Sequence, residues 1–489
     1  MLKSITESPL FPIVNPKSIA FFGASNNISA MGTTQLNSLM DLGFEGAIYP
    51  VHPKEETVQG LRAYRSVYDL PEVPDLAILV LPTRIVSQTL SDCGKRGIKH
   101  AIVVSGGFKE AGKKGKALEK ELIEIADTYG IRFIGPNCLG VTNSHHKLNT
   151  TFLRYEGPAG FIGMASQSGS FVTQMFDYLA RRGLGFSTAF SVGNEANVDI
   201  VDCMKYLGAC PHTKVIALYI EGIRNGRAFI KAAREISQQK PIVAFYVGGS
   251  EEGKKAGLSH TGAMAGPDKL YDGVFSQSGI VRAESIAELF DFCQVLACLP
   301  KPAGRRVVIQ THSGGPGASA ADSCGRLGLE LPSLSPETEE KLAPFIPHTG
   351  SIQNPIDLTF AKNPMDYFSN IPDILLDEKN ADALMIYFLM PTAMVQQSLE
   401  QMGVAAERIE KKSVALIERL CESVSGLLKA HGKPLVGFTF RSLSDHFIKG
   451  LLRRNVPVFA SPEQAAKALR ALVTYKELSE KISSEAESI

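Results

Sequence analysis

Three stretches of the chain repeat one local pattern: a short apolar run, a turn of small residues and an amphipathic segment. The pattern appears as SIAFFGASNN around Gly23, as GFIGMASQSGS around Ser168 and as RVVIQTHSGGPG around Gly314. Short apolar runs that alternate with helical periodicity are typical of βαβ units, which build parallel sheets with helices on both faces. The sequence therefore predicts an α/β protein of three doubly wound, Rossmann- or flavodoxin-like domains with mostly parallel sheets.

The length and the places where the pattern restarts predict the domain boundaries. A chain of 489 residues exceeds what one hydrophobic core usually supports, so about three domains are expected. The βαβ pattern starts again after Asn143, and the polar segment KPAGRR at 301–306 has the composition of a linker. We expect domains at 1–143, 144–300 and 301–489, the second closed by the helical segment ELFDFCQVLACLP.

Charge and composition exclude several classes of protein. Lys+Arg and Asp+Glu number 51 and 50, so a surface that coats nucleic acid is not expected. The amino terminus lacks the layout of a signal peptide, and no apolar run approaches the roughly 20 residues that span a bilayer, which predicts a cytoplasmic protein without membrane segments. The eight cysteines form no CxxC pair and have no histidine at metal-site spacing, so we expect reduced thiols and no metal site.

The first domain carries the signs of a nucleotide-type site without those of NAD. Backbone amides at Gly23, Ala24 and Ser25 follow a strand and precede a helix, where a phosphate is favoured. An NAD site needs an acidic residue at the end of the second strand, but that strand ends in His52 and Lys54. A cation there favours a phosphorylated ribose such as that of coenzyme A, although two glutamates follow directly and a merely solvated lysine is the alternative.

Other strand ends of the first domain fall on the same edge of its sheet. In a doubly wound fold the ligand lies at the carboxyl ends of the strands. We therefore expect the rest of a coenzyme A to contact the turns that follow them, at Pro82, Thr83, Ser105, Gly106, Gly107 and Asn137.

A histidine in a glycine-rich loop is the candidate nucleophile. His260 lies in GSEEGKKAGLSHTGAMAG, directly after the strand PIVAFYVGG, rather than on an apolar periodic face. A neutral imidazole attacks phosphoryl groups well, and a carboxylate on its other nitrogen steadies the charge that develops. Glu221 ends the preceding strand, VIALYIEG, so both groups should emerge at one edge of the sheet.

A second anion site is expected opposite this loop. The segment ASQSGS ends a strand and FVTQMFDYLARRG continues as a helix, so the small residues between them form a helix N-terminus open to phosphate. A further turn, SVGNEANVD, could line the same cavity, and for Glu195 a catalytic and a solvated-loop role are equally compatible with the sequence. The predicted phosphate or acyl-phosphate residues are Gln167, Ser168, Gly169, Ser170 and Asn194.

These motifs together resemble a known family. SHTGAMAG, SQSGS, SVGNEANVD, GASNN and GPNCLG, with SGGPG and QNPIDLT in the third domain, resemble the alpha subunit of ADP-forming acetate:CoA ligase and, more distantly, that of succinyl-CoA synthetase. The resemblance spans about the whole chain in the same domain order. It implies a CoA-binding domain, a ligase domain with a phosphohistidine and a flavodoxin-like third domain.

The resemblance also implies a reaction and a partner. Phosphate would attack an acyl-CoA, the acyl phosphate would phosphorylate His260, and the phosphoryl group would pass to ADP, in a reversible sequence that links acyl-CoA and the free carboxylic acid. The sequence has no Walker motif, ATP-grasp pattern or carboxylate cluster for Mg²⁺, so ADP or ATP and Mg²⁺ are expected on an ATP-grasp beta subunit, in a heterotetramer.

Some alternatives stay open at this point. A CoA-binding regulatory or scaffolding protein is opposed by the intact His260 and glycine turns, and an NAD-dependent dehydrogenase would need the missing acidic ribose ligand. An acyltransferase of similar domains would need a further module. The family usually has Asn before the third-domain glycines where this chain has His312, so that side chain either touches the bound anion or is a turn residue. The acyl group is not identified.

Overall fold

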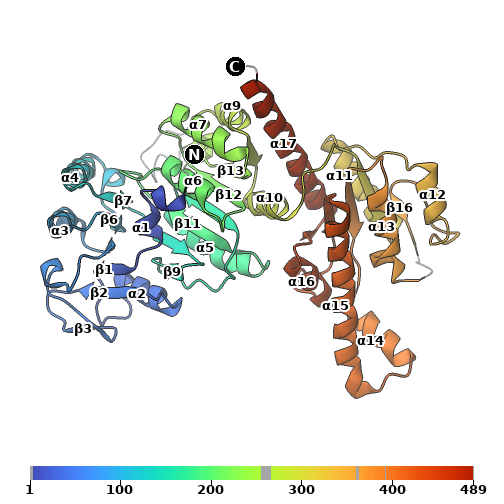
Figure 1. The fold of residues 1–489 in the computed structure, drawn as a ribbon, viewed down its shortest axis with the longest axis horizontal. Helices are drawn as coiled ribbons and strands as arrows, with labels where there is room; N and C mark the ends of the chain where they lie inside the picture. Colours follow the sequence, from blue (N-terminus) through green and yellow to red (C-terminus); the bar gives the residue numbers. More distant parts are fainter. Residues whose placement is uncertain (1–3, 255–265, 360–362, 391, 488–489) are drawn as a thin grey trace. The chain divides into compact units, whose positions relative to one another are not determined.

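The computed structural model describes residues 4–254, 266–359, 363–390 and 392–487. The chain folds into two compact units, Met1–Ser285 and Ile286–Ile489. Figure 1 shows the α/β elements of each unit, and each unit is described separately below. The predicted α/β class with mostly parallel sheets is confirmed.

The first unit begins with a five-stranded parallel sheet. The strands are β2 (Ala47–Val51), β1 (Ser18–Phe22), β5 (Leu76–Leu79), β6 (His100–Val103) and β7 (Arg132–Ile134), in that spatial order. Residues in β1 alternate between two buried clusters: Ile19 and Phe21 face one side, and Ala20 and Phe22 face the other. Burial on both faces explains why these strands read as continuous apolar runs.

Helices cover both faces of this sheet. The helix α2 (Met31–Asp41) and the short α1 (Phe11–Val14) share a cluster with Ile19 and Phe21. The helices α3 (Thr83–Arg96) and α4 (Lys113–Tyr129) share a cluster with Ala20 and Phe22. Parallel strands joined by helices of this kind place all their carboxyl ends at one edge, which is where the candidate site lies.

A seven-stranded sheet follows in the same unit. Its order is β14 (Ile280–Ala283), β13 (Ile242–Tyr246), β12 (Val215–Ile220), β10 (Ile162–Ser166), β11 (Phe186–Ser191), β8 (Gly140–Asn143) and β9 (Leu148–Asn149). The first five strands are parallel, whereas β8 pairs antiparallel with β11 and with β9. The chain therefore passes from the first sheet to the second before Asn143, and the four residues 140–143 belong to the second sheet. The associated helices are α5 (Gly169–Ala180), α6 (Ile200–Ala209), α7 (Gly226–Ser237) and α9 (Asp268–Ser278).

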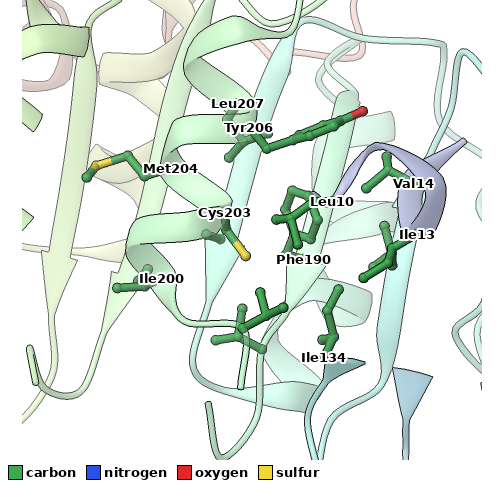
Figure 2. Packing of buried hydrophobic residues seen from close by; sticks show 14 of the residues in the cluster. Leu10, Ile13, Val14, Ile134, Phe190, Ile200, Cys203, Met204, Tyr206 and Leu207 are labelled. Atoms are coloured by element: carbon green, nitrogen blue, oxygen red, sulfur yellow. The ribbon is translucent and has the colours of Figure 1, made fainter. Parts of the chain in front are cut away.

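The two sheets of the first unit share one hydrophobic core. Figure 2 shows Leu10, Ile13 and Val14 of the α1 region gathered near Phe190 of β11, with Cys203 and Tyr206 of α6 on the other side. The Phe190 and Tyr206 rings meet edge to face with centroids 5.5 Å apart, and Asn15 donates to the Tyr206 hydroxyl at 3.0 Å. Burying each such aliphatic side chain contributes about 1.5–3 kcal/mol, so α1 fixes one sheet against the other.

The second unit contains the third parallel sheet. Its strands lie in the order β16 (Ile356–Asp357), β15 (Val307–Thr311), β17 (Ala383–Tyr387), β18 (Leu435–Phe438) and β19 (Val458–Phe459). The helices of this unit are α10 (Ile286–Cys298), α11 (Gly314–Arg326), α12 (Pro336–Leu342), α13 (Asn370–Asp377), α14 (Thr392–Gln401), α15 (Ala406–His431), α16 (His446–Arg453) and α17 (Pro462–Glu487).

The helix expected to close the second domain begins the second compact unit. This helix, α10, packs against α17, and Lys467 of α17 reaches Glu288 of α10 at 2.7 Å. The division into domains at 1–143, 144–300 and 301–489 stays a prediction. Among the described residues, no helix is both long enough and apolar enough to cross a membrane.

Candidate active site

A cavity of about 830 Å³ lies in the first unit, where the carboxyl ends of both its sheets face each other. From the first sheet it is lined by residues after β5, β6 and β7. From the second it is lined by the start of α5 and by residues after β11 and β12. Gly266, Leu270 and Tyr271 complete the wall. The volume is within the range of pockets that hold small molecules and cofactors.

The cavity brings together predicted residues from both anion sites. Among its lining residues are Ser105, Gly106, Asn137, Gln167, Gly169, Ser170, Asn194 and Glu221. The other predicted CoA and phosphate residues are not in the lining; these are Gly23, Ala24, Ser25, Lys54, Pro82, Thr83, Gly107 and Ser168. Thr83 nevertheless lies at its edge, because its hydroxyl donates to the Gly106 carbonyl at 2.6 Å.

The predicted helix N-terminus is present. Ser168 is the N-cap residue of α5, in extended backbone conformation, and the helix begins at Gly169. No side chain caps the first turn. Gly169 and Ser170 line the cavity, so the positive end of a twelve-residue helix faces it.

The Gln167 side chain holds Glu221 at the cavity wall. Its Oε1 atom accepts from the backbone amides of Glu221, at 2.6 Å, and Gly222, at 3.0 Å. Its Nε2 atom donates to the Gly222 carbonyl at 2.7 Å and to Glu195 Oε2 at 2.8 Å. Because both ends of the amide are bonded, Gln167 fixes the turn that presents Glu221 beyond the end of β12.

Glu195 is a buried structural partner in this network rather than a solvated loop residue. Only 6% of its surface is exposed, and its Oε1 atom accepts from the Ile200 amide at 2.8 Å. Burial raises its pKa, against the opposing effects of Arg224, 3.7 Å from Oε2, and of Gln167. The backbone at Glu195 is left-handed, with φ +52°. A carboxylate held this way in a strained turn orients its neighbours. The sequence alone did not distinguish this role from that of a solvated loop residue.

Two cations that the sequence analysis did not single out converge on this turn. Lys109 Nζ and an Arg224 guanidinium nitrogen both donate to the Asn194 carbonyl, and Arg224 also donates to the Glu195 carbonyl at 2.5 Å. Both cations line the cavity. Burial and then the nearby Arg224 lower the pKa of Lys109. In the sequence, the one local feature that pointed to these two residues is a basic residue shortly after a strand-end turn, as in SGGFK and IEGIR.

Carboxylates from the first sheet hold the Asn194 side chain. Its Nδ2 atom donates to Glu110 at 2.6 Å and to Glu119 at 2.8 Å, and its Oδ1 atom accepts from Asn137 at 3.4 Å. Burial opposes ionisation of Glu110, but the hydrogen bonds from Asn194, Gly107 and Phe108 outweigh it and lower its pKa. Asn194 thus ties the two sheets together across the cavity.

The predicted CoA loop is braced internally. The Ser25 amide donates to Thr33 Oγ1 at 3.0 Å, so in this structure that amide is engaged within the loop. Asn26 donates to Glu55 at 3.2 Å, and the exposed Lys54 donates its backbone amide to His52 Nδ1 at 3.3 Å. Gly23 has φ +96°, and a Cβ there would lie 1.9 Å from the Val80 carbonyl oxygen, so only glycine fits.

The candidate nucleophile, His260, lies outside the described residues. The described chain around it ends with Lys254, beyond β13, and begins again at Gly266. The β13 and β12 strands are parallel neighbours, and the Val247 amide donates to the carbonyl of Ile220, the residue before Glu221, at 2.9 Å. Gly266 lines the cavity and accepts from the Tyr246 hydroxyl at 2.9 Å.

Histidines and cysteines elsewhere have structural surroundings. His145 stacks on His212 with ring centroids 3.9 Å apart, whereas His146 contacts the Pro16 carbonyl at 2.8 Å, so the adjacent pair points in different directions, as predicted. The eight cysteines are all unpaired thiols. Within the described ranges, no group of three or more metal-ligating side chains could hold an ion.

Family models match the three sheet-containing regions in order. A CoA binding domain matches residues 17–144, a succinyl-CoA ligase-like flavodoxin domain matches 159–296, and a Ligase-CoA domain matches 307–426. The region that builds one side of the cavity therefore matches a CoA binding domain, and the region that builds the other matches the succinyl-CoA ligase-like flavodoxin domain, whereas the Ligase-CoA domain matches part of the second unit.

Relatives cover nearly the full length of the chain. The subunit alpha of acetate–CoA ligase (ADP-forming) II from Pyrococcus furiosus is 38% identical over 94% of this chain and 96% of its own. Acetate–CoA ligase (ADP-forming) I from Archaeoglobus fulgidus is 36% identical over 95% of this chain and 64% of its own. The structure of acetyl-coenzyme A synthetase 1 from Candidatus Korarchaeum cryptofilum with phosphate and ADP superposes with a TM-score of 0.84, at 31% identity, covering 97% of this chain and 98% of that one.

The protein is therefore a CoA-dependent ligase chain. Its parallel sheets, its cavity and its matched domains place it in the succinyl-CoA ligase-like class. The first domain matches a CoA binding domain, whereas the contact of its glycine turns with CoA stays a prediction. The chain belongs to the family of alpha subunits of ADP-forming acetate–CoA ligases. The subunit naming of these relatives implies a partner subunit.

Proposed function

We propose that this chain carries the acyl and phosphoryl half of an ADP-forming acyl-CoA synthetase, with His260 as the phosphorylated residue and Glu221 as its carboxylate partner. The observation that carries the proposal is the convergence, in one cavity, of the α5 N-terminus, Glu221 clamped by Gln167, and the strand ends of the CoA-binding domain. The backbone amides at a helix N-terminus stabilise a phosphate, and no charged side chain has to lose its hydration for this.

In the first step, an oxygen of inorganic phosphate attacks the carbonyl carbon of the acyl-CoA thioester. The bond between carbon and sulfur breaks, CoA leaves as the thiolate, and an acyl phosphate remains. The amides at Gly169 and Ser170 support the phosphate, and the turns at Ser105, Gly106 and Asn137 position the thiol end of CoA. Lys109 and Arg224 add positive charge at the cavity wall, which favours the anionic species formed there.

In the second step, a nitrogen of the neutral His260 imidazole attacks the phosphorus of the acyl phosphate. The bond between phosphorus and the acyl oxygen breaks, and the carboxylic acid leaves as its carboxylate. Glu221 accepts a hydrogen bond from the protonated nitrogen of the ring, which stabilises the charge formed on phosphorylation. The reverse sequence makes acyl-CoA from the free acid.

The third step needs the partner subunit. A terminal oxygen of ADP attacks phosphorus, the bond to the His260 nitrogen breaks, and ATP forms. We assign ADP or ATP, with the Mg²⁺ that neutralises their phosphates, to an ATP-grasp beta subunit in a heterotetramer. The absence of a cluster of metal-ligating side chains among the described residues supports this assignment.

A labelling experiment tests the proposal. The chain is mixed with its partner subunit, acetyl-CoA and ³²P-labelled phosphate without ADP, and the acid-labile label is mapped. We expect label on His260, its absence in His260→Asn, and slower labelling in Glu221→Gln. His348→Asn, which changes an exposed histidine of the second unit, is the matched control and keeps the label. Label retained in His260→Asn would overturn the assignment.

A further inference from the structure

One corner of the cavity is apolar and adjoins the α5 N-terminus. Met31, Leu139 and Phe152 line it, from the start of α2, from the crossing between the sheets and from the segment after β9. Gly169 lies against Leu139, since a Cβ at this glycine would be 3.6 Å from Leu139 Cγ. The polar groups Lys109, Glu195 and Arg224 belong to other parts of the wall.

A second cavity lies behind Phe152. It has a volume of about 490 Å³ and is lined by residues of α2, of α5 and of the segment 152–156. Thr173 and Phe176 of α5, both almost fully buried, lie in its lining. Phe152 is the residue that appears in the lining of both cavities. The two cavities therefore adjoin at Phe152.

The far side of the second cavity is polar. Arg154 pairs with Asp41 at 2.8 Å, and both residues line this cavity. The α5 side chains Thr173 and Phe176 line the same cavity.

We propose that Met31, Leu139 and Phe152 form the acyl-binding site and that Phe152 limits the size of the acyl group. This inference rests on the proposed function, because the thioester carbon must lie next to a phosphate held at Gly169 and Ser170. Leu139 is the apolar side chain that lies against Gly169, and an aliphatic tail next to a phosphate held there is stabilised by contact with such apolar groups rather than with Lys109 or Arg224. The Phe152 ring closes the corner, so the natural substrate is a short aliphatic acyl thioester.

Shortening residue 152 should join the two cavities. In Phe152→Ala the corner opens into the space lined by Thr173 and Phe176, where an aryl ring can stack edge to face on Phe176. The substrate class then shifts from short aliphatic acyl groups to arylacetyl groups. Discrimination between acyl groups differing by one or a few methylenes is typically about 10–200-fold in such pockets, so a shift of at least about 10-fold is expected.

The test compares kcat/KM for acetyl-CoA, butyryl-CoA and phenylacetyl-CoA, using the chain assembled with its partner subunit. We expect the ratio of phenylacetyl-CoA to acetyl-CoA to rise at least about 10-fold in Phe152→Ala, by loss on acetyl-CoA and gain on phenylacetyl-CoA. Phe152→Leu, which keeps an apolar side chain and guards against misfolding of the alanine variant, should shift the ratio in the same direction by less. Leu153→Ala is the control, because Leu153 lines the second cavity alone and is 40% exposed, and its ratio should match the wild type.

Three results separate this inference from the proposed function. If the wild-type chain takes up label from phosphate and acetyl-CoA but both Phe152 variants keep the wild-type ratio, the acyl site is misplaced. An equal fall on all three thioesters would also overturn it, since that result indicates a general loss of structure. If the wild-type chain takes up no label at His260, the proposed function itself fails.

Discussion

His312 gives a prediction about pH that follows from the structure of the second unit. Its ring stacks on Tyr367 with centroids 3.6 Å apart and planes at 11°, and its Nε2 atom is buried without a hydrogen-bond partner among the described residues. Burial lowers the pKa of His312 to about 4 from an ordinary value of 6.5. The neutral ring is therefore favoured in the folded protein, and a protonated ring is favoured when the chain unfolds.

The sign and size follow from linkage. A histidine whose folded pKa is lowered contributes stability above its unfolded pKa, and this contribution is lost as the pH falls from 6.5 towards 4. With one pKa unit equal to about 1.4 kcal/mol, the loss is about 2 kcal/mol at pH 5 and about 3 kcal/mol at pH 4. In His312→Phe, which keeps an aromatic ring on Tyr367 but cannot take a proton, this loss should disappear.

The measurement is urea-induced unfolding between pH 8 and pH 5, with hydrogen exchange of β15 and β17 amides to report on the second unit. The free energy of unfolding of His312→Phe minus that of the wild type should rise by about 2 kcal/mol over this range. His348→Asn changes an exposed histidine of the same unit and should show no such rise. A difference between His312→Phe and wild type that stays constant from pH 8 to pH 5 would refute the reasoning.

Two further predictions concern the turns around the cavity. Gly193→Ala should destabilise the first unit by more than about 2 kcal/mol in urea unfolding, because Gly193 has φ +58° and a Cβ would lie 2.4 Å from the Asn137 carbonyl oxygen. Gly183→Ala, at φ +69° with open space around it, should cost only about 1–2 kcal/mol, and equal costs would contradict the role of the close approach. Gln167→Glu should slow phosphorylation more than Gln167→Ala in single-turnover labelling, because a second carboxylate would face Glu195 at the position of the 2.8 Å hydrogen bond. Equal rates for the two Gln167 variants would argue against that contact.

Much of the fold could be predicted from the sequence. Apolar runs such as SIAFF and VIALYI became β1 and β12, because strands buried on both faces must be apolar throughout. The helix start at Ser168 and Gly169 was readable from small residues before an amphipathic stretch. The antiparallel strands β8 and β9 were not predicted, because two- to four-residue strands that pair with a distant partner leave little local pattern.

The candidate site was only partly readable. The sequence alone determined which turns end parallel strands, and therefore that Gln167, Asn194 and Glu221 share one edge of a sheet, since strand direction places all such turns together. It did not reveal Lys109 and Arg224 as partners of Asn194, or Phe152 as a residue that lines two cavities. Lys109 and Asn194 are 85 residues apart and come from different sheets, so only the packing of those sheets against each other brings the cation to the carbonyl. The local sequence pattern specifies the strands and helices, whereas contacts between elements far apart in the sequence decide which side chains line the cavity.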